Sequence, residues 1–333
     1  MIKTGKDFLK RSKILISVFF IFSLGFTFTA CSDGGGSSNQ DGNSKMVKIP
    51  PGIFNMGSPT TESGRSNNEK QHQVSLTSGF YIGKYQVTQK QWKDVMGEDA
   101  RLNRINTGND YGRGDNFPMF FISWYDVLVY CNMLSEIEKL SSAYEMETTT
   151  PGVWSTDISL WGTVPEEIND TRWNSVRIVP DSSGYRMPTE AQWEYACRAG
   201  KTTAYNDGSD NYSIPENIAK LAWYYSNSDK KTHEVGQKAA NAWGLYDMHG
   251  NLDEWCWDWY GGDYDNSFQT RTNSAATGFE DPAGPSTGTN RVRRGGGWNT
   301  TISFMRSASR NSFLAYSLGG NSIGFRLIRP LQD

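Results

Sequence analysis

The 333-residue sequence lacks excess positive charge, internal repeats and recognisable catalytic pairs. Its 33 Lys and Arg are balanced by 36 Asp and Glu, and the formal net charge is −3. The basic stripe or polybasic tail that binds phosphate backbones is absent, which excludes nucleic acid as a partner. No segment of roughly 20 to 50 residues repeats, which excludes solenoids and propellers. Ser-His and Lys-Asp pairs at a catalytic spacing are also absent.

Cysteine is scarce, and none of the four cysteines has the CxxC spacing of a redox or metal motif. Three of them, Cys131, Cys197 and Cys256, follow the N-terminal region. An odd number excludes complete pairing into disulfides in an exported chain. Each of the three lies in aromatic or helical sequence, so we expect buried thiols rather than metal ligands or nucleophiles.

The N-terminus has the order of a secretion signal. Basic residues at positions 3–13 precede an apolar run over residues 14–28, which is too short to indicate a membrane-spanning helix. The run ends at Thr29-Ala30-Cys31, which resembles the lipobox of bacterial lipoproteins, with Phe28 where leucine is usual. In that class the cysteine is acylated and becomes the mature N-terminus.

This resemblance implies a lipoprotein signal peptide over residues 1–30, lipidation at Cys31 and attachment to a membrane through the lipid anchor. Residues 31–45 are rich in Gly, Ser, Asn and Asp and are predicted to be a flexible tether. We therefore expect a lipoprotein of the bacterial cell envelope, at the outer membrane or cell surface. The alternatives are an uncleaved anchor and a plain secretion signal.

The remaining residues, 46–333, are predicted to form one α+β domain, because few helical patterns alternate with many short strands and long loops. Thr88, Ser123 and Thr189 are the predicted N-caps of helices. Apolar alternation around a Pro-Gly turn predicts a hairpin over residues 46–58. Residues 140–183 have no sustained period and are predicted to be an insertion with short strands near Trp154 and over residues 176–179.

The C-terminal stretch 291–327 has an unusual composition. It begins with Arg291-Val-Arg-Arg-Gly-Gly-Gly-Trp298 and ends with Gly324-Phe-Arg-Leu327, short apolar runs whose glycines permit close backbone approach. Between these ends, residues 299–322 contain no Lys, Asp, Glu, Gln, Trp or Pro. The mixture of aromatic residues with small polar residues is typical of a binding loop.

Several motifs follow one another along the chain: Pro51-Gly-Ile-Phe-Asn-Met-Gly-Ser58, Tyr85-Gln-Val-Thr-Gln-Lys-Gln-Trp92, Ile122-Ser-Trp-Tyr-Asp126, Tyr185-Arg-Met-Pro-Thr-Glu-Ala-Gln-Trp-Glu-Tyr195, Gly244-Leu-Tyr-Asp-Met-His-Gly-Asn251 and Arg294-Gly-Gly-Gly-Trp298. In this order they resemble the formylglycine-generating enzyme, or sulfatase-modifying factor, family. The resemblance implies the family's C-type-lectin-like fold, an irregular α+β fold with few helices and short strands.

The activity of the family does not follow from its fold. In the enzymes, paired cysteines shortly after the Arg-Gly-Gly element oxidise a substrate cysteine, whereas residues 299–310 here contain none. Iron-dependent relatives use clustered histidines, and His72, His233 and His249 are far apart in sequence. We therefore expect no enzymatic activity and no required cofactor. Glu254, with carbonyls of residues 249–252, matches a family calcium site, so structural Ca2+ is expected there unless Glu254 forms a salt bridge instead.

The cysteine-free stretch is also similar to the variable region of proteins diversified by bacterial retroelements. The matching residues are Arg291-Val-x-Arg-Gly-Gly-x-Trp298, Arg306-Ser-Ala-x-Arg310 and Gly324-Phe-Arg-Leu327. In that class a scaffold of Arg, Gly, Trp and Phe stays fixed while neighbouring adenine-rich codons vary. Such codons cannot encode Lys, Glu, Gln, Trp or Met, and Met305 is the one exception in 299–322.

We predict a ligand-binding face within this stretch, with Phe304, Phe313 and Tyr316 as aromatic anchors. Its members are Thr300, Thr301, Ile302, Phe304, Ser309, Asn311, Phe313, Leu314, Tyr316, Ser317 and Leu318. The alternative is that about half of the apolar members fill the core. Arg306 and Arg310 are expected to brace backbone carbonyls.

The leading hypothesis is a lipid-anchored surface receptor or adhesin that binds an unidentified protein or surface ligand through this diversified face. One alternative is an enzyme of the family, or an accessory factor, that modifies or chaperones another exported protein. The other is a structural lipoprotein without a small ligand.

Overall fold

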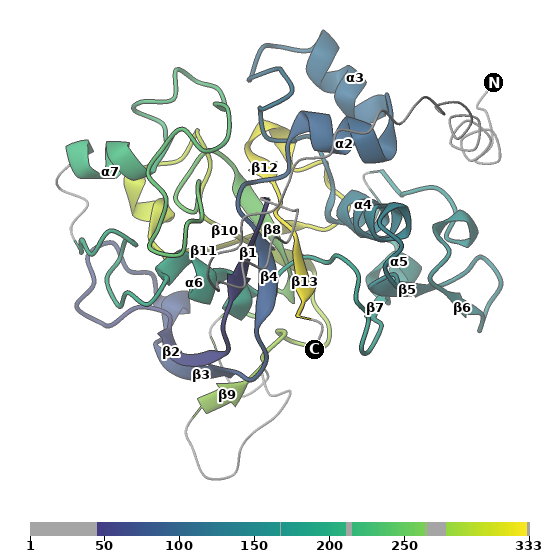
Figure 1. The fold of residues 1–333 in the computed structure, drawn as a ribbon, viewed down its shortest axis with the longest axis horizontal. Helices are drawn as coiled ribbons and strands as arrows, with labels where there is room; N and C mark the ends of the chain where they lie inside the picture. The colour runs from purple at the N-terminus through teal and green to yellow at the C-terminus, as the bar shows by residue number, and fades with distance from the viewer. Residues whose placement is uncertain (1–44, 167, 211–214, 263, 265–277, 332–333) are drawn as a thin grey trace, which may run out of the picture. The chain divides into compact units, whose positions relative to one another are not determined.

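The computed structural model of the protein describes residues 45–166, 168–210, 215–262, 264 and 278–331. The predicted signal peptide 1–30, the lipidation site Cys31 and the tether up to residue 44 lie outside this part. No helix among the described residues is both long and apolar enough to cross a membrane. Short strands and a few helices are interleaved along the chain, which confirms the predicted α+β class (Figure 1).

The described strands form small sheets, each made from segments distant in sequence. The largest has the order β11 (Arg310–Leu314), β10 (Asn290–Arg294), β8 (Asp253–Trp259), β12 (Ile323–Gly324). The three-stranded sheets are β1 (Met46–Ile49), β4 (Phe80–Gly83), β13 (Ile328–Pro330); β2 (Gly52–Met56), β3 (His72–Leu76), β9 (Gly278–Glu280); and β6 (Trp154–Ser155), β5 (Tyr144–Glu147), β7 (Arg177–Ile178). The last of these lies in the predicted insertion and confirms the strands expected there.

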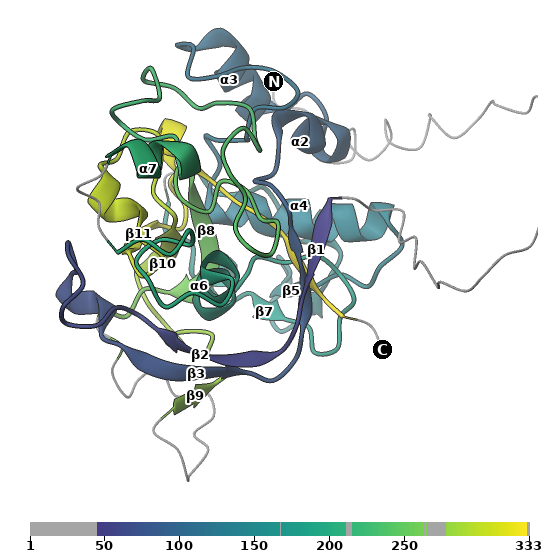
Figure 2. The same cartoon turned by 60° about the vertical axis from the view of Figure 1, so that its left-hand side comes forward.

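Strand β4 joins the two ends of the domain. It pairs antiparallel with β1 on one edge and with β13 on the other, as Figure 1 shows. The predicted hairpin over residues 46–58 is wrong, because β1 pairs with β4 whereas β2 pairs with β3. The Pro50-Pro51 step explains the difference: proline donates no ladder hydrogen bond, and the chain changes sheet there. Figure 2 shows the β2–β3–β9 sheet apart from β8 and β10.

The predicted N-caps are confirmed. Thr88, Ser123 and Thr189 each accept a hydrogen bond from the backbone N–H three residues on, and each helix start forms a reciprocal capping box. The capped helices are α2 (Gln89–Met96), α4 (Trp124–Ile137) and α6 (Glu190–Arg198). The other helices are α3 (Ala100–Thr107), α5 (Thr171–Asn174) and α7 (Pro215–Leu221), with 3-10 turns η1 (Asn67–Glu69), η2 (Ile158–Leu160), η4 (Ile302–Met305) and η5 (Gly320–Ser322).

Strand β8 separates two hydrophobic cores. Trp255 packs with the residues of α2 and α4, whereas the next residue, Cys256, packs with α6 and β10. Because successive side chains of a strand point to opposite faces, a strand between two cores is apolar on both sides. This position explains the Trp-Cys-Trp run, and it places the β10–β11 edge of the sheet beside both cores.

Candidate ligand-binding face

The stretch 291–327 begins and ends beside the same central strand. Strand β10 pairs antiparallel with β8, and β12 pairs parallel with β8 through Ile323 and Gly324. Strand β11 lies outside β10 at the edge of the four-stranded sheet. The predicted scaffold at both ends is therefore confirmed, and the intervening residues are held at the sheet edge between fixed points.

Glycines at the start of the stretch bring backbone segments into contact. Gly296 has φ of 72°, and a Cβ there would lie 3.0 Å from the carbonyl oxygen of Phe304 and 3.0 Å from Oγ1 of Thr300. A side chain at Gly297 would lie 2.9 Å from the carbonyl oxygen of Ser322. Only glycine combines this conformation with this proximity, so the loop folds back over the Gly-Gly-Gly segment.

Most of the predicted ligand-binding residues reach solvent. The 3-10 turn η4 directs Phe304 outward, at 50% exposure, and buries Met305 completely. The members that are partly or fully exposed are Thr300, Thr301, Ile302, Phe304, Asn311, Phe313, Leu314, Tyr316, Ser317 and Leu318. Phe313 and Tyr316 also pack on the core of α2 and α4, so each presents only part of its ring.

Ser309 is the exception, and its inclusion in the face is wrong. Its exposure is 5%, and its carbonyl oxygen accepts a hydrogen bond from Arg294. The cause is the buried run from Met305 to Arg310, in which every residue is inside the domain. A small polar residue suits the interior here because the arginine satisfies its backbone acceptor.

Arg306 fixes the loop to the N-terminal part of the domain. Its Nη1 donates to Glu62 Oε1 and Glu69 Oε2, each at 2.6 Å, and its Nη2 donates to Glu69 Oε1 at 2.7 Å. It also donates to the carbonyl oxygens of Ser303 and Gly64, as the sequence predicted. All three charged side chains are buried, so the pairs are shielded from solvent screening.

Arg310, at the end of the buried run 305–310, fixes the loop to helix α6. Its Nε and Nη2 donate to the two oxygens of Glu190 at 2.6 and 2.8 Å. Burial raises the pKa of Glu190, but the charges of Arg310 and Arg294 outweigh that effect and leave the pKa below its usual value. The sequence did not reveal that Glu190 and Glu194, both on α6, are the partners of Arg310 and Arg294.

Two aromatic residues beside the loop were not predicted. The backbone N–H of Tyr225, a residue 63% exposed, donates to the carbonyl oxygen of Thr300. The ring of Tyr111 stacks on Trp298 with centroids 5.8 Å apart. Both lie in irregular segments without a period or motif, so no signal in the sequence linked them to the loop.

The cysteines confirm the prediction of buried thiols. Cys131, Cys197 and Cys256 are all unpaired and completely buried. Burial raises the pKa of Cys197 to about 12, and its Sγ lies 3.7 Å from Ser307 Oγ beneath the loop. A thiol that stays protonated is a poor nucleophile.

The predicted metal ligand Glu254 forms a buried ion pair, which was the stated alternative. Its oxygens accept from Nε and Nη2 of Arg326 at 2.6 and 2.7 Å. Several oxygens nevertheless converge beside it. The Nε2 of Gln86 lies 2.8 Å from the carbonyl oxygen of Leu252, 3.3 Å from that of Gly250 and 2.9 Å from Glu254 Oε1.

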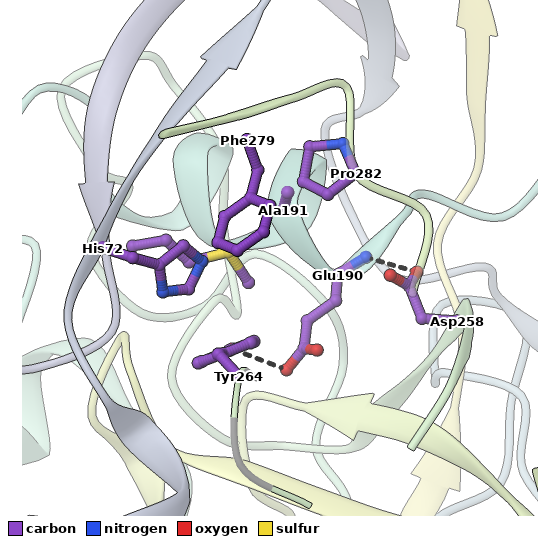
Figure 3. Close-up of a pocket in the computed structure, with 8 residues that line it drawn as sticks. His72, Glu190, Ala191, Asp258, Tyr264, Phe279 and Pro282 are labelled. Carbon is purple, nitrogen blue, oxygen red and sulfur yellow. Dashed lines mark hydrogen bonds between the residues drawn. The ribbon is translucent and has the colours of Figure 1, made fainter. Parts of the chain in front are cut away.

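A second site, at the start of α6, is too small for a ligand. Figure 3 shows Glu190 between Asp258 and Tyr264: its N–H donates to Asp258 Oδ2 at 2.7 Å, and its Oε1 accepts from the Tyr264 hydroxyl at 3.1 Å. His72, Phe279 and Pro282 close the other sides. The cavity has room for about one water molecule.

A family model, the Sulfatase-modifying factor enzyme 1-like domain, matches residues 35–331. The chain belongs to the sulfatase-modifying factor family. Its fold is the C-type-lectin-like fold of the formylglycine-generating enzyme type. The predicted relation to retroelement-type variable proteins is also confirmed at the level of structure, because Treponema denticola variable protein 1 matches with a TM-score of 0.71 and 29% identity over 86% of this chain and 95% of that chain.

Relatives that are similar to this chain have different names. The chaperone protein LppX of Paenibacillus barcinonensis is 31% identical over 94% of this chain and 98% of its own length. The formylglycine-generating enzyme of Mus musculus is 26% identical over 85% of this chain and 74% of its own. Membership in the family therefore does not decide between an enzyme and a binding protein.

Proposed function

We propose that this protein binds a protein ligand through the exposed part of residues 299–322 and does not catalyse a reaction. One observation carries the proposal: the stretch is divided into a buried, arginine-anchored part and an exposed part that contains aromatic and small polar residues. The anchors fix the backbone without using the exposed side chains. Those side chains are therefore available for contact with a ligand.

The composition of the exposed part supports binding. Phe304, Phe313 and Tyr316 are aromatic and partly exposed, and aromatic residues supply large contact areas with little loss of rotamer freedom. The Ser, Thr and Asn residues around them can donate and accept hydrogen bonds. Tyr225 lies beside these residues, because its backbone N–H donates a hydrogen bond to the carbonyl oxygen of Thr300.

The chemistry of the region supports the absence of catalysis. Residues 299–310 contain no cysteine, and the nearest described thiol, Cys197, lies buried under the loop. Its raised pKa keeps it protonated at neutral pH. Incubating the protein with a sulfatase-type peptide that contains cysteine tests this point. No aldehyde is expected, and aldehyde formation would overturn it.

We further propose that the exposed positions are diversified by a retroelement. The similarity to Treponema denticola variable protein 1 and the restricted composition of 299–322 support this proposal. The encoding locus is expected to contain a reverse transcriptase and a near-identical template that differs at adenines. Sibling clones with an invariant 299–322 segment would contradict it.

The cellular location is part of the same proposal. The lipobox-like Thr29-Ala30-Cys31 and the polar tether after it support a lipid-anchored protein of the bacterial envelope. An anchor of this kind would hold the domain outside the membrane with the binding face free to meet a partner. Metabolic labelling with a fatty-acid analogue tests it, because Cys31→Ser is expected to abolish the label.

We propose that a structural calcium ion can bind beside the Glu254–Arg326 pair, at the oxygens around Gln86. Calcium prefers carbonyl and carboxylate oxygens, and those of Gly250, Leu252 and Glu254 converge on the Gln86 amide. The Oε1 atom of Gln86 is itself buried without a hydrogen-bond partner among the described residues. Reversing that amide would add a further oxygen to the set. When bound, the ion would fix the turn that leads into β8.

Panning a random-peptide display library against the full chain tests the binding function. Peptides that bind the wild-type protein are expected to lose binding when Phe313 and Tyr316 are both replaced by alanine. A variant with the remote, exposed Ile137 replaced by alanine is the matched control. Peptides that bind all three proteins equally would contradict the location of the site.

The second candidate function is binding of an exported client protein, which the similarity to the chaperone LppX favours. A chaperone retains an unfolded client and releases a folded one, whereas a receptor binds a folded ligand. Suppression of aggregation of a chemically unfolded protein distinguishes the two. Suppression that persists in the Phe313→Ala and Tyr316→Ala variant would favour a chaperone with a different site.

A further inference from the structure

We propose that Arg293 is a fixed recognition residue of the binding face, and that the face selects a partner protein presenting an Asp or Glu side chain beside an apolar group. The inference rests on the proposed binding function and names the chemistry of its partner. Arg293 lies outside residues 299–322 and belongs to the scaffold strand β10.

The sheet register places Arg293 among the exposed residues of the loop. It lies directly opposite Asn311 on β11, and directly opposite residues of an antiparallel pair point to the same side of the sheet. Its guanidinium carbon is 5.4 Å from the centroid of the Phe313 ring. Arg293 therefore lies beside an amide and an aromatic ring that both belong to the predicted face.

A buried carboxylate holds the guanidinium in place. Arg293 Nη1 lies 3.1 Å from Asp253 Oδ2, and the backbone N–H of Gly296 donates to Asp253 Oδ1 at 3.2 Å. The Asp253 side chain is 3% exposed, whereas the Arg293 side chain is 17% exposed. The Asp253 carboxylate thus orients the guanidinium from its buried side and leaves part of the Arg293 side chain exposed to solvent.

Arg293 differs from the other arginines of the stretch. Arg294, Arg306 and Arg310 are buried, and both terminal nitrogens of each donate to carboxylates or carbonyls. The Arg293 side chain is 17% exposed, its Nη1 lies against Asp253, and its buried Nε has no hydrogen-bond partner among the described residues. Of the five N–H donors of a guanidinium, those of Nη2 and the second one of Nη1 are left for a group that approaches from solvent.

The charges around Arg293 favour an acidic group. Residues 299–322 contain no Asp, Glu or Lys, so the loop offers no competing acid and no second flexible cation. A carboxylate can accept two parallel hydrogen bonds from a guanidinium, which gives geometric specificity as well as attraction. Phe313 beside it would contact an apolar neighbour of that carboxylate. A short acidic and apolar sequence on a protein surface meets both requirements.

Random-peptide display on the full chain tests the inference, with the composition of the selected pool as the readout. Peptides fused through their C-termini are used, so that only side-chain carboxylates can contribute. The pool selected on wild type is expected to contain about two- to fivefold more Asp and Glu than the unselected library, the range given by a partly exposed ion pair. Arg293→Lys is expected to retain part of this excess.

Removing Arg293 alone would leave Asp253 buried without its partner, so the decisive variant is the double replacement Arg293→Gln with Asp253→Asn. The new amide oxygen can still accept from Gly296, and a thermal melt verifies folding. This variant is expected to lose the acidic excess. Asp253→Asn alone, which keeps the guanidinium but removes the acid that orients it, is expected to keep part of the excess, and the remote control Ile137→Ala is expected to keep all of it. An equal excess in the double variant, or none on wild type, would overturn the role of Arg293. Failure to select any peptide would instead contradict the proposed binding function.

Discussion

The two halves of the terminal loop differ in what their side chains contact. From Met305 to Arg310 every residue is buried, and both arginines form ion pairs with acids from distant parts of the chain. From Asn311 to Ser317 every residue except Ala315 is partly exposed, and none is charged. Substitutions in the first half are expected to destabilise the fold, because its side chains contact residues in distant parts of the chain. The second half has few such partners, so its sequence can change with less effect on the fold.

The largest expected effect comes from breaking the buried anchor at Arg306. Replacing Arg306 by alanine leaves Glu62 and Glu69 buried without a cation and is expected to lower the free energy of unfolding by about 3–5 kcal/mol. Urea denaturation measures the change. In the triple variant Arg306→Met, Glu62→Gln and Glu69→Gln no charge is left unpaired, so most of the loss should be recovered. An equally unstable triple variant would show that packing, and not charge, maintains this half.

Removal of calcium is expected to have the next largest effect. If an ion binds near Glu254, free calcium at about a hundred times its dissociation constant adds about 2.7 kcal/mol to the free energy of unfolding. Chelation should lower the melting temperature accordingly, and magnesium should not restore it. A melting temperature unaffected by chelator would leave Glu254 as the acceptor for Arg326, Gln86 and Trp193, without a role in metal binding.

A smaller effect is expected from pH through Asp258. Burial, followed by the nearby charge of Glu190, raises the pKa of Asp258 to about 7. The folded state then holds a proton that the unfolded state, with a pKa of about 3.9, releases. Stability through this group should therefore fall as the pH rises from about 4 to about 7.

Asp258→Asn tests that pH dependence. Its melting temperature should fall less steeply than that of wild type between about pH 5 and pH 8, by an amount equivalent to roughly 2.5 kcal/mol. The amide oxygen can still accept from the Glu190 N–H. Replacing the exposed Asp229 by asparagine is the control. Parallel curves for wild type and Asp258→Asn would refute the assignment.

The smallest effect on stability is expected at an exposed residue directly before the buried half. Phe304 is 50% exposed, and Phe304→Ser should change the free energy of unfolding by no more than about 0.5 kcal/mol. The neighbouring Met305 is completely buried, and Met305→Ala should cost about 2–5 kcal/mol. Similar losses for the two variants, measured by urea denaturation, would contradict the division between outward and inward residues.

The sequence allowed prediction of the features that depend on local contacts. The caps at Thr88, Ser123 and Thr189 were predicted because side chain and amide lie three residues apart. The scaffold at both ends of the loop was predicted because its glycines and arginines match a known family.

Features that depend on distant partners were not predictable. The sequence of residues 46–58 does not show that β1 pairs with β4, because the partner strand, residues 80–83, is distant in sequence. The partners of Arg306 lie at Glu62 and Glu69, far away in sequence. Ser309 is buried because the ion pairs of Arg306 hold this part of the chain inside the domain. Its residue type does not indicate burial, since serine is usually exposed.

The most direct test of the central claim is a library randomised at the exposed positions of 299–322, displayed on cells and sorted for protease resistance. The matched library is randomised at Met305, Arg306, Ser307, Ala308 and Arg310. Most members of the first library are expected to remain folded, whereas few members of the second should survive sorting. Equal survival of the two libraries would contradict the claim that a fixed, buried scaffold supports an interchangeable binding face.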